Sequence, residues 1–174
     1  TVLYFAIGEE QAAWTVDLGE RQVYSMTHDK SGGLVIVCDD GIDRYVDGEL
    51  TRSIPFTQSV RLFSARESGE VLVAFETAER SNRMTRALLL GDGLEMLWSG
   101  QFEGVPRALD CQDGTGCLLM SDRLEQIRWH HDEITTRTVP HDGARDVVVN
   151  DDGEAILIYS DRAEKVPEES EETE

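Results

Sequence analysis

The pattern of hydrophobic and polar positions repeats four times along the chain. The copies are "SMTHDKSGGLVIVCDD" from Ser25, "LFSARESGEVLVAFE" from Leu62, "ALDCQDGTGCLLMSD" from Ala108 and "VVVNDDGEAILIYSD" from Val147. In each copy an alternating apolar run is followed by a polar turn that contains glycine and then by a second apolar run. Two such runs on either side of a tight polar turn are typical of a β-hairpin. The sequence therefore predicts four hairpins, and helical periodicity is nearly absent.

Two more strand-like stretches follow each of the first three hairpins. They are "IDRYVDGE" and "LTRSIPF", then "MTRALLLGDG" and "LEMLWSGQF", then "LEQIRWHHDE" and "ITTRTVPH". Each unit thus holds four short antiparallel strands in roughly 37 to 46 residues, the size of one β-propeller blade. We expect blades over residues 23–56, 60–102, 106–141 and 144–166. The stretch "AERSNRMTRALLL" has some helical character, but its place in the second unit predicts a longer loop between strands.

The two ends of the chain carry incomplete units. After the fourth hairpin only "RAEKV" precedes the charged "PEESEETE", whereas "TVLYFAIGEE" and "QAAWTVDLGE" at the N-terminus predict two strands without a hairpin of their own. These two match the third and fourth strands of the second unit, with Trp14 in the place of Trp98. We therefore expect residues 1–20 to pair beside Ala155–Ser160 and to complete the last blade. Such closure would remove the unpaired strand edges that invite aggregation.

The predicted fold is all-β, a small four-bladed β-propeller over residues 1–166 that is closed by the N-terminal strands. Residues 167–174 form an acidic tail that we expect to be disordered. Three alternatives stay open. The chain forms part of a propeller of about six to eight blades, or two copies join into a larger ring, or the short strands build a β-sandwich.

The blade pattern resembles degenerate WD-repeat, NHL and quinoprotein-type propellers. It consists of a hydrophobic inner strand, an acidic turn with glycine, a hydrophobic second strand and an ending such as "CDD" or "YSD", and it reaches to about residue 166. The Gly-His pair ahead of a blade and the terminal Trp-Asp pair of WD repeats are absent. The resemblance therefore implies a propeller of no particular family, and no family site residues can be transferred.

The composition is strongly acidic and poor in lysine. The 174 residues include 35 acidic and 16 basic ones, for a net charge of -19, and only Lys30 and Lys165 are lysines. Carboxylates in excess with few lysines are typical of salt-in halophiles such as haloarchaea, where molar salt screens self-repulsion over about 3 Å. An acidic mesophile protein that happens to have few lysines is the alternative. The charge balance argues against a general nucleic-acid-binding surface.

The sequence shows no sign of membrane insertion or export. No apolar run approaches the roughly 18 residues of a membrane helix, and the N-terminus lacks a secretory signal, so we expect a cytoplasmic protein. Cys38, Cys111 and Cys117 are its three cysteines. Cys111 and Cys117 flank a short turn, where either a disulfide or two buried free thiols would fit. A reducing compartment favours the free thiols.

Motifs for metal or enzyme chemistry are few. The turns hold two acidic groups, Asp39, Asp40 and Asp43, and Asp151, Asp152 and Glu154. Each group supplies too few oxygens for calcium, and Asp and Gly are common in tight turns. The histidines, His28, His130, His131 and His141, form no zinc spacing with the cysteines. Nucleophile-elbow, phosphate-loop and dinucleotide motifs are absent, so we expect no cofactor and no metal, and the motifs favour a protein without enzymatic activity over an enzyme.

Arginine recurs at the start of the predicted inner strands. Arg61 lies in "VRLF", Arg107 in "PRAL" and Arg145 in "ARDV", and Arg21 in "ERQVY" is a residue or two out of register. Inner strands line the central channel of a propeller, so we expect these side chains to gather at one mouth. There they would bind a carboxylate, a phosphate or an acidic peptide through bidentate hydrogen bonds.

The alternative role of these arginines is structural, through pairing with a neighbouring carboxylate such as Asp146 or Glu103. Among the aromatic residues, Trp129 beside Arg128 and His130 is the best candidate for an exposed contact with a partner. Trp14 and Trp98 are expected to pack between blades.

Together these patterns favour a non-enzymatic scaffold that binds another protein on a propeller face or at the channel mouth. The second hypothesis is a module that senses an anion or small molecule at the same mouth, with hydrolytic activity as a further option. Contact with RNA inside a larger ribonucleoprotein is a third, which the charge balance disfavours. The sequence leaves the oligomeric state open.

Overall fold

The structure of this chain is a computed structural model. It describes residues 1–4, 11–58, 60–66, 69–79, 82–130 and 133–167. Within these ranges the chain forms β-strands in five antiparallel sheets and no helix, as the sequence predicts. No helix with the length and hydropathy needed to span a bilayer occurs in the described ranges. The acidic tail at 167–174 lies, apart from Pro167, outside the described residues.

The first sheet contains strands β3 (Val23–His28), β4 (Leu34–Cys38), β5 (Gly41–Val46) and β6 (Glu49–Pro55), in this order. The predicted hairpin is the β3–β4 pair. Its polar turn forms because the Asp29 carboxylate accepts hydrogen bonds from backbone amides two and four residues further on.

The second sheet contains β7 (Val60–Ala65), β8 (Val71–Glu79), β9 (Asn82–Leu90) and β10 (Met96–Glu103). The longer loop expected in "AERSNRMTRALLL" is wrong, because β8 and β9 pair continuously from Val71–Leu90 to Glu79–Asn82. The stretch alternates with a period of two, so that Thr85, Ala87 and Leu89 are buried. Alternation of this kind fits a strand with one covered face.

The third sheet contains β11 (Ala108–Gln112), β12 (Thr115–Leu119), β13 (Arg123–His130) and β14 (Glu133–Pro140). Asp113 and Gly114 form the turn between β11 and β12, with φ of 41° and 85°. Two consecutive positive φ angles match a two-residue hairpin turn, for which Asp-Gly is a preferred pair.

The fourth sheet has three strands, β15 (Asp146–Val149), β16 (Ala155–Ile158) and β17 (Ala163–Lys165). The N-terminal β1 (Val2–Tyr4) and β2 (Trp14–Val16) pair only with each other within the described residues. The predicted closure of a ring by residues 1–20 beside Ala155–Ser160 is therefore wrong.

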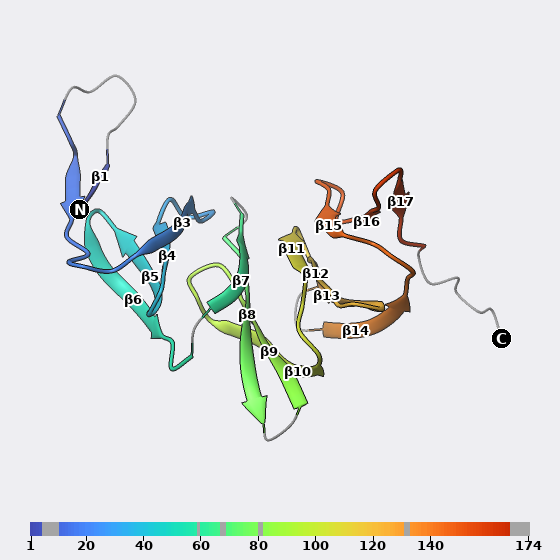
Figure 1. Cartoon of the computed structure of the whole chain (residues 1–174). Helices are drawn as coiled ribbons and strands as arrows, with labels where there is room; N and C mark the ends of the chain where they lie inside the picture. Colours follow the sequence, from blue (N-terminus) through green and yellow to red (C-terminus); the bar gives the residue numbers. More distant parts are fainter. Residues whose placement is uncertain (5–10, 59, 67–68, 80–81, 131–132, 168–174) are drawn as a thin grey trace.

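Both ends of the chain explain why the N-terminal strands do not pair with the fourth sheet. The edge of β16 that was expected to receive the N-terminal strands is occupied by β17, which starts after a turn closed by the Tyr159 amide and the Arg162 carbonyl. The β1–β2 hairpin instead lies against the face of the first sheet. Figure 1 shows the sheets as an open arc with the two termini at opposite ends.

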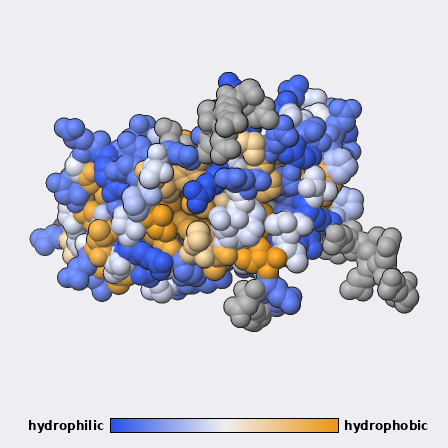
Figure 2. Space-filling model, turned by 90° about the horizontal axis from the view of Figure 1, so that it is seen from below, coloured by the Kyte–Doolittle hydropathy of each residue, from blue (hydrophilic) through white to orange (hydrophobic). Residues whose placement is uncertain are grey.

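The core consists of apolar layers between successive sheets. The layers are Val35, Val37 and Ile42 against Val71, Val73 and Phe75, then Leu72, Ala74 and Leu89 against Leu118 and Ile127, then Leu119 and Leu124 against Val147, Val149 and Leu157. A further layer lies between the β1–β2 hairpin and Leu34, Ile36, Cys38 and Tyr45 of the first sheet. Alternate residues of the second strand in the first three sheets thus face the layers on its two sides, which explains the continuous apolar sequence of that strand. In Figure 2, hydrophilic side chains cover most of the face shown, and hydrophobic ones show between them.

The three cysteines are free and buried. Cys111 packs in the layer toward the second sheet, whereas Cys117 packs in the layer toward the fourth. Their side chains point to opposite faces of one sheet, so a disulfide between them is excluded by geometry. Burial raises the pKa of both thiols to about 12, so that both stay protonated and unreactive at neutral pH.

Candidate functional site

The innermost strands of the second, third and fourth sheets lie side by side in one direction. Asp110, in the middle of β11, accepts a hydrogen bond of 2.8 Å from the Ser64 hydroxyl near the end of β7. It also accepts one of 2.9 Å from the backbone amide of Val149 at the end of β15. Ser64, Asp110 and Val149 are therefore level with one another. The starts of β7, β11 and β15 lie two to four residues before them, on the order of 10 Å away at roughly 3.3 Å per residue.

Asp110 also forms a part-buried ion pair with Arg66, whose side chain is 43% exposed. Nη2 of Arg66 lies 2.6 and 2.7 Å from the two oxygens of the Asp110 carboxylate, whose side chain is 7% exposed. The hydrogen bond to this carboxylate raises the pKa of Arg66. All four contacts of Asp110 join neighbouring sheets, so its role is structural.

The starts of the inner strands carry the arginines expected from the sequence. Arg61, Arg107 and Arg145 lie at or just before the starts of β7, β11 and β15, and all three are exposed. The backbone amides of Arg107 and Arg145 bond the carbonyls of Leu119 and Ile158, at 2.7 and 2.8 Å. The backbone is thus anchored while the guanidinium groups extend into solvent. We call Arg61, Arg107 and Arg145 the arginine end.

The members of the arginine end differ in their partners. Arg61 has a long ion pair of 3.8 Å with Glu76. In the described part of the chain, Arg107 and Arg145 have no carboxylate within 4.0 Å. The Asp146 carboxylate accepts from its neighbouring amide at Val147 instead.

Arg21 is engaged within the first sheet. Its Nε lies 2.6 Å from the Asp40 carboxylate, and its Nη1 pairs with Asp43, whose side chain is 2% exposed. Asp43 also accepts hydrogen bonds from Ser53 and Tyr45, at 2.6 and 3.2 Å. Burial and the Asp43 charge together raise the pKa of Tyr45 to about 12. The guanidinium of Arg21 therefore stabilises β5 and is not available in the way that Arg107 and Arg145 are.

Trp129 lies away from the arginine end. It is half-buried near the end of β13, and its backbone amide bonds the carbonyl of Gly114 at 2.9 Å. Gly114 belongs to the turn that follows β11, which is the end opposite Arg107. Gly116 leaves space for the indole, since a Cβ at Gly116 would lie 3.3 Å from the ring of Trp129. The structure thus separates Trp129 from the three arginines.

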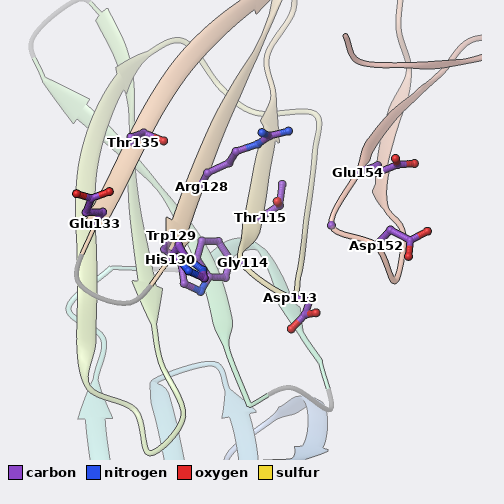
Figure 3. A pocket seen from close by; sticks show the side chains of 11 residues that line it. Asp113, Gly114, Thr115, Arg128, Trp129, His130, Glu133, Thr135, Asp152 and Glu154 are labelled. Atoms are coloured by element: carbon purple, nitrogen blue, oxygen red, sulfur yellow. The ribbon is translucent and has the colours of Figure 1, made fainter. Parts of the chain in front are cut away.

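A surface pocket of about 370 Å³ lies beside Trp129. Its lining consists of Asp113, Gly114, Thr115, Arg128, Trp129, His130, Glu133, Thr135, Asp152, Gly153 and Glu154. In Figure 3 the residues of the fourth sheet lie on one side of the pocket and those of β14 on the other. Sequence analysis did not predict this pocket, although the equivalence of the third and fourth hairpin turns would have brought Asp113 and Asp152 near each other.

The acidic turns are explained by backbone geometry. Asn150 accepts hydrogen bonds from the amides of Asp152 and Glu154, at 3.1 and 2.8 Å. Lys165 pairs with Glu154, and this hydrogen bond lowers the pKa of that carboxyl. A search of the described ranges finds no group of three or more His, Cys, Asp and Glu residues that could hold a metal ion.

The fold is that of solved β-propellers. The WD40 propeller domain of Doa1 is similar with a TM-score of 0.54 and 10% identity, over 92% of this chain and 55% of that one. Hsv2 of Kluyveromyces lactis is similar with a TM-score of 0.52 and 10% identity, over 87% and 48%. A chain of an S. cerevisiae complex, Dbp5 bound to Nup159, Gle1, IP6 and ADP, is similar with a TM-score of 0.50 and 8% identity, over 79% and 39%.

Other comparisons are negative. No protein-family description matches this chain, and no curated protein does so at a significant level.

The chain spans about half the length of the propellers it matches. Its sheets have the arrangement of β-propeller blades in an open arc, and the identity of about 10% limits the likeness to the fold.

Proposed function

We propose that this chain is a non-enzymatic scaffold that binds an acidic segment of a partner protein at the arginine end. The observation that carries the proposal is the pair of exposed residues Arg107 and Arg145, which have no carboxylate within 4.0 Å among the described residues, in a chain of net charge -19. Carboxylates engage Arg21, Arg44 and Arg66, whereas the exposed Arg52, Arg86 and Arg128 also have none within 4.0 Å in the described ranges but do not share one end of the inner strands. An arginine left unpaired among so many acids is free to meet an anionic partner.

The anchoring of the arginine end also supports binding. Its backbone belongs to the strand ladders, and rigid strands hold a binding surface with little loss of conformational entropy. Fold analogy adds that a similar chain belongs to a complex in which Dbp5 is bound to Nup159 and Gle1. Because fold does not determine function, this analogy supports a scaffold in general and no particular partner.

The test is binding of a fluorescent polyglutamate peptide, followed by anisotropy at about 0.2 M and about 2 M KCl. We expect R107A/R145A to weaken binding by at least about tenfold, because two charge-assisted contacts are lost. The control is R86A, since Arg86 is also exposed but lies on β9. Equal affinity of R107A/R145A and the unaltered chain would contradict the proposal.

A small anion at the same guanidinium groups is the second candidate. The two groups have the chemistry to bind one dianion as well as a peptide carboxylate. Citrate and pyrophosphate are therefore added in thermal-shift measurements and as competitors of the peptide. A rise in melting temperature that R107A/R145A abolishes, without peptide binding, would assign the sensing function instead.

A further inference from the structure

The outer face of the fourth sheet carries a cluster of apolar side chains that nothing in the described structure covers. Asp146, Ala163 and Lys165 lie at the margin of the cluster on the same side. In the second strands of the first three sheets, the residues that face the following sheet are Val35 and Val37, Leu72 and Ala74, and Cys117 and Leu119. All six are fully buried. The equivalent residues in the fourth sheet are Ile156 and Ile158, which are half-exposed. Ile156 and Ile158 are therefore apolar at positions that would face a further apolar layer if another sheet followed the fourth.

The neighbouring inner strand extends this face. Val148 pairs with Ile156 across the β15–β16 ladder, so the two side chains point to the same side. Val148 is 40% exposed. A sheet face that contacts water normally carries polar residues. We call Val148, Ile156 and Ile158 the tail face.

At the other end of the arc, the first sheet also has apolar side chains that nothing in the described structure covers. The β1–β2 hairpin covers Leu34, Ile36, Cys38 and Tyr45, which belong to β4 and β5. On the inner strand β3, Val23 and Met26 lie opposite Cys38 and Ile36 and point to the same side. They are 36% and 52% exposed. The hairpin thus takes the place of the outer half of a preceding blade, and the inner half is missing. We call Val23 and Met26 the head face.

We propose that the tail face of one copy packs on the head face of a second copy. The fourth sheet of the first copy would cover the head face of the second copy, where inner strands are missing. The β1–β2 hairpin of the second copy would then lie along the outer part of that fourth sheet. The two faces cannot meet within one copy because they lie at opposite ends of the arc (Figure 1). Since the chain spans about half of the similar propellers, two copies related by a twofold axis would close one ring through two identical junctions.

Charge sets the conditions for this association. Each copy carries -19, so two copies repel at low ionic strength. At about 1 M salt the screening length falls to about 3 Å, and the burial of apolar side chains then dominates. Dimers are therefore expected in molar KCl.

The experiment is sedimentation equilibrium of the full chain in about 2 M KCl. We expect twice the monomer mass of 19.5 kDa. Val148→Asp and Met26→Asp should each return the monomer, whereas Met96→Asp, at a 62% exposed position on the outermost strand β10, should leave the dimer intact. Circular dichroism verifies that each variant is folded.

A mixture of the two variants tests the direction of packing. Val148→Asp has an intact head face and Met26→Asp an intact tail face, so one sound junction forms between them and dimers should reappear on mixing. A monomeric unaltered chain would overturn the proposal and leave the tail face to a different polypeptide. A dimer that Met26→Asp leaves unchanged would show that the head face is not part of the interface and would overturn it too. Neither result bears on the arginine end.

Discussion

Asp29 and Asn150 close equivalent hairpin turns with different chemistry. In both turns one side-chain oxygen accepts hydrogen bonds from the amides two and four residues further on. Asp29 also pairs with Arg44 through its second oxygen, and its side chain is fully buried. Asn150 closes its turn without a charge. The same local geometry thus depends on ionisation in the first sheet and not in the fourth.

The stability of the first turn should therefore depend on pH. Burial alone would raise the pKa of Asp29, but the hydrogen bonds from Arg44, Ser31 and Gly33 outweigh it, so the folded-state pKa is lowered from 3.8. The unfolded chain then binds the proton first, so this contribution is present above pH 3.8 and is lost as the pH falls through the folded-state pKa.

We expect Asp29→Asn to cost about 1 to 3 kcal/mol of unfolding free energy at pH 7 and progressively less below pH 4. Urea unfolding of both proteins between pH 7 and pH 2.5, at constant salt, measures this difference. Asn150→Asp serves as the comparison, because it adds a carboxylate at the equivalent turn. A constant difference between the Asp29→Asn and unaltered curves would show that the charge of Asp29 does not matter.

At the scale of elements, hydrogen bonds at the strand ends hold the sheets in register. Most contacts between successive sheets are apolar and therefore have no preferred direction along the strands. Asp110 is directional, because its carboxylate joins Ser64 and Arg66 from the second sheet to the Val149 amide of the fourth. This one side chain aligns three inner strands and so places the arginine end.

Asp110→Ala should lower the unfolding free energy by about 3 kcal/mol, since it leaves the Ser64 hydroxyl and the Val149 amide without their buried acceptor. The measurement is urea denaturation in high salt. Asp142→Ala, at an exposed loop position, is the matched control and should change stability by less than about 0.5 kcal/mol. Equal losses in the two variants would refute the aligning role of Asp110.

At the scale of the whole molecule, charge and shape act together. The molecule is an open arc whose surface carries most of the 35 acidic residues, while few basic residues offset them. Self-repulsion of such a surface opposes compaction, and salt screens it. A composition of this kind therefore predicts that the stability of the protein rises with salt concentration.

We expect the melting temperature to rise on the order of 5 °C or more between about 0.1 M and 2 M KCl. A variant with Glu49→Gln, Glu103→Gln and Asp142→Asn, three exposed positions, should show a shallower rise because it repels itself less. Differential scanning calorimetry provides both slopes. A melting temperature independent of KCl would remove the halophilic interpretation.

Several local features were predictable because short-range rules govern them. Period-two alternation predicts the hairpins, and "DG" at Asp113 predicts the turn with two positive φ angles. The same alternation runs through Thr85, Ala87 and Leu89, yet a loop was expected there, since the place in the repeat was given more weight than the pattern itself. The arginines recur at strand starts, which is why the sequence pattern predicts them at one common end of the inner strands.

The sequence by itself determined the all-β class, the four hairpins and the apolar faces of each second strand, because these depend on residues near one another in the chain. Only the tertiary structure decided that β17 takes the edge of β16, that the N-terminal hairpin covers the first sheet, and that Trp129 lies opposite the arginine end. The physical reason is that these features arise from packing between sheets. Packing depends on side-chain volumes across two faces and on which strand edge is already occupied, and neither is visible in a local pattern.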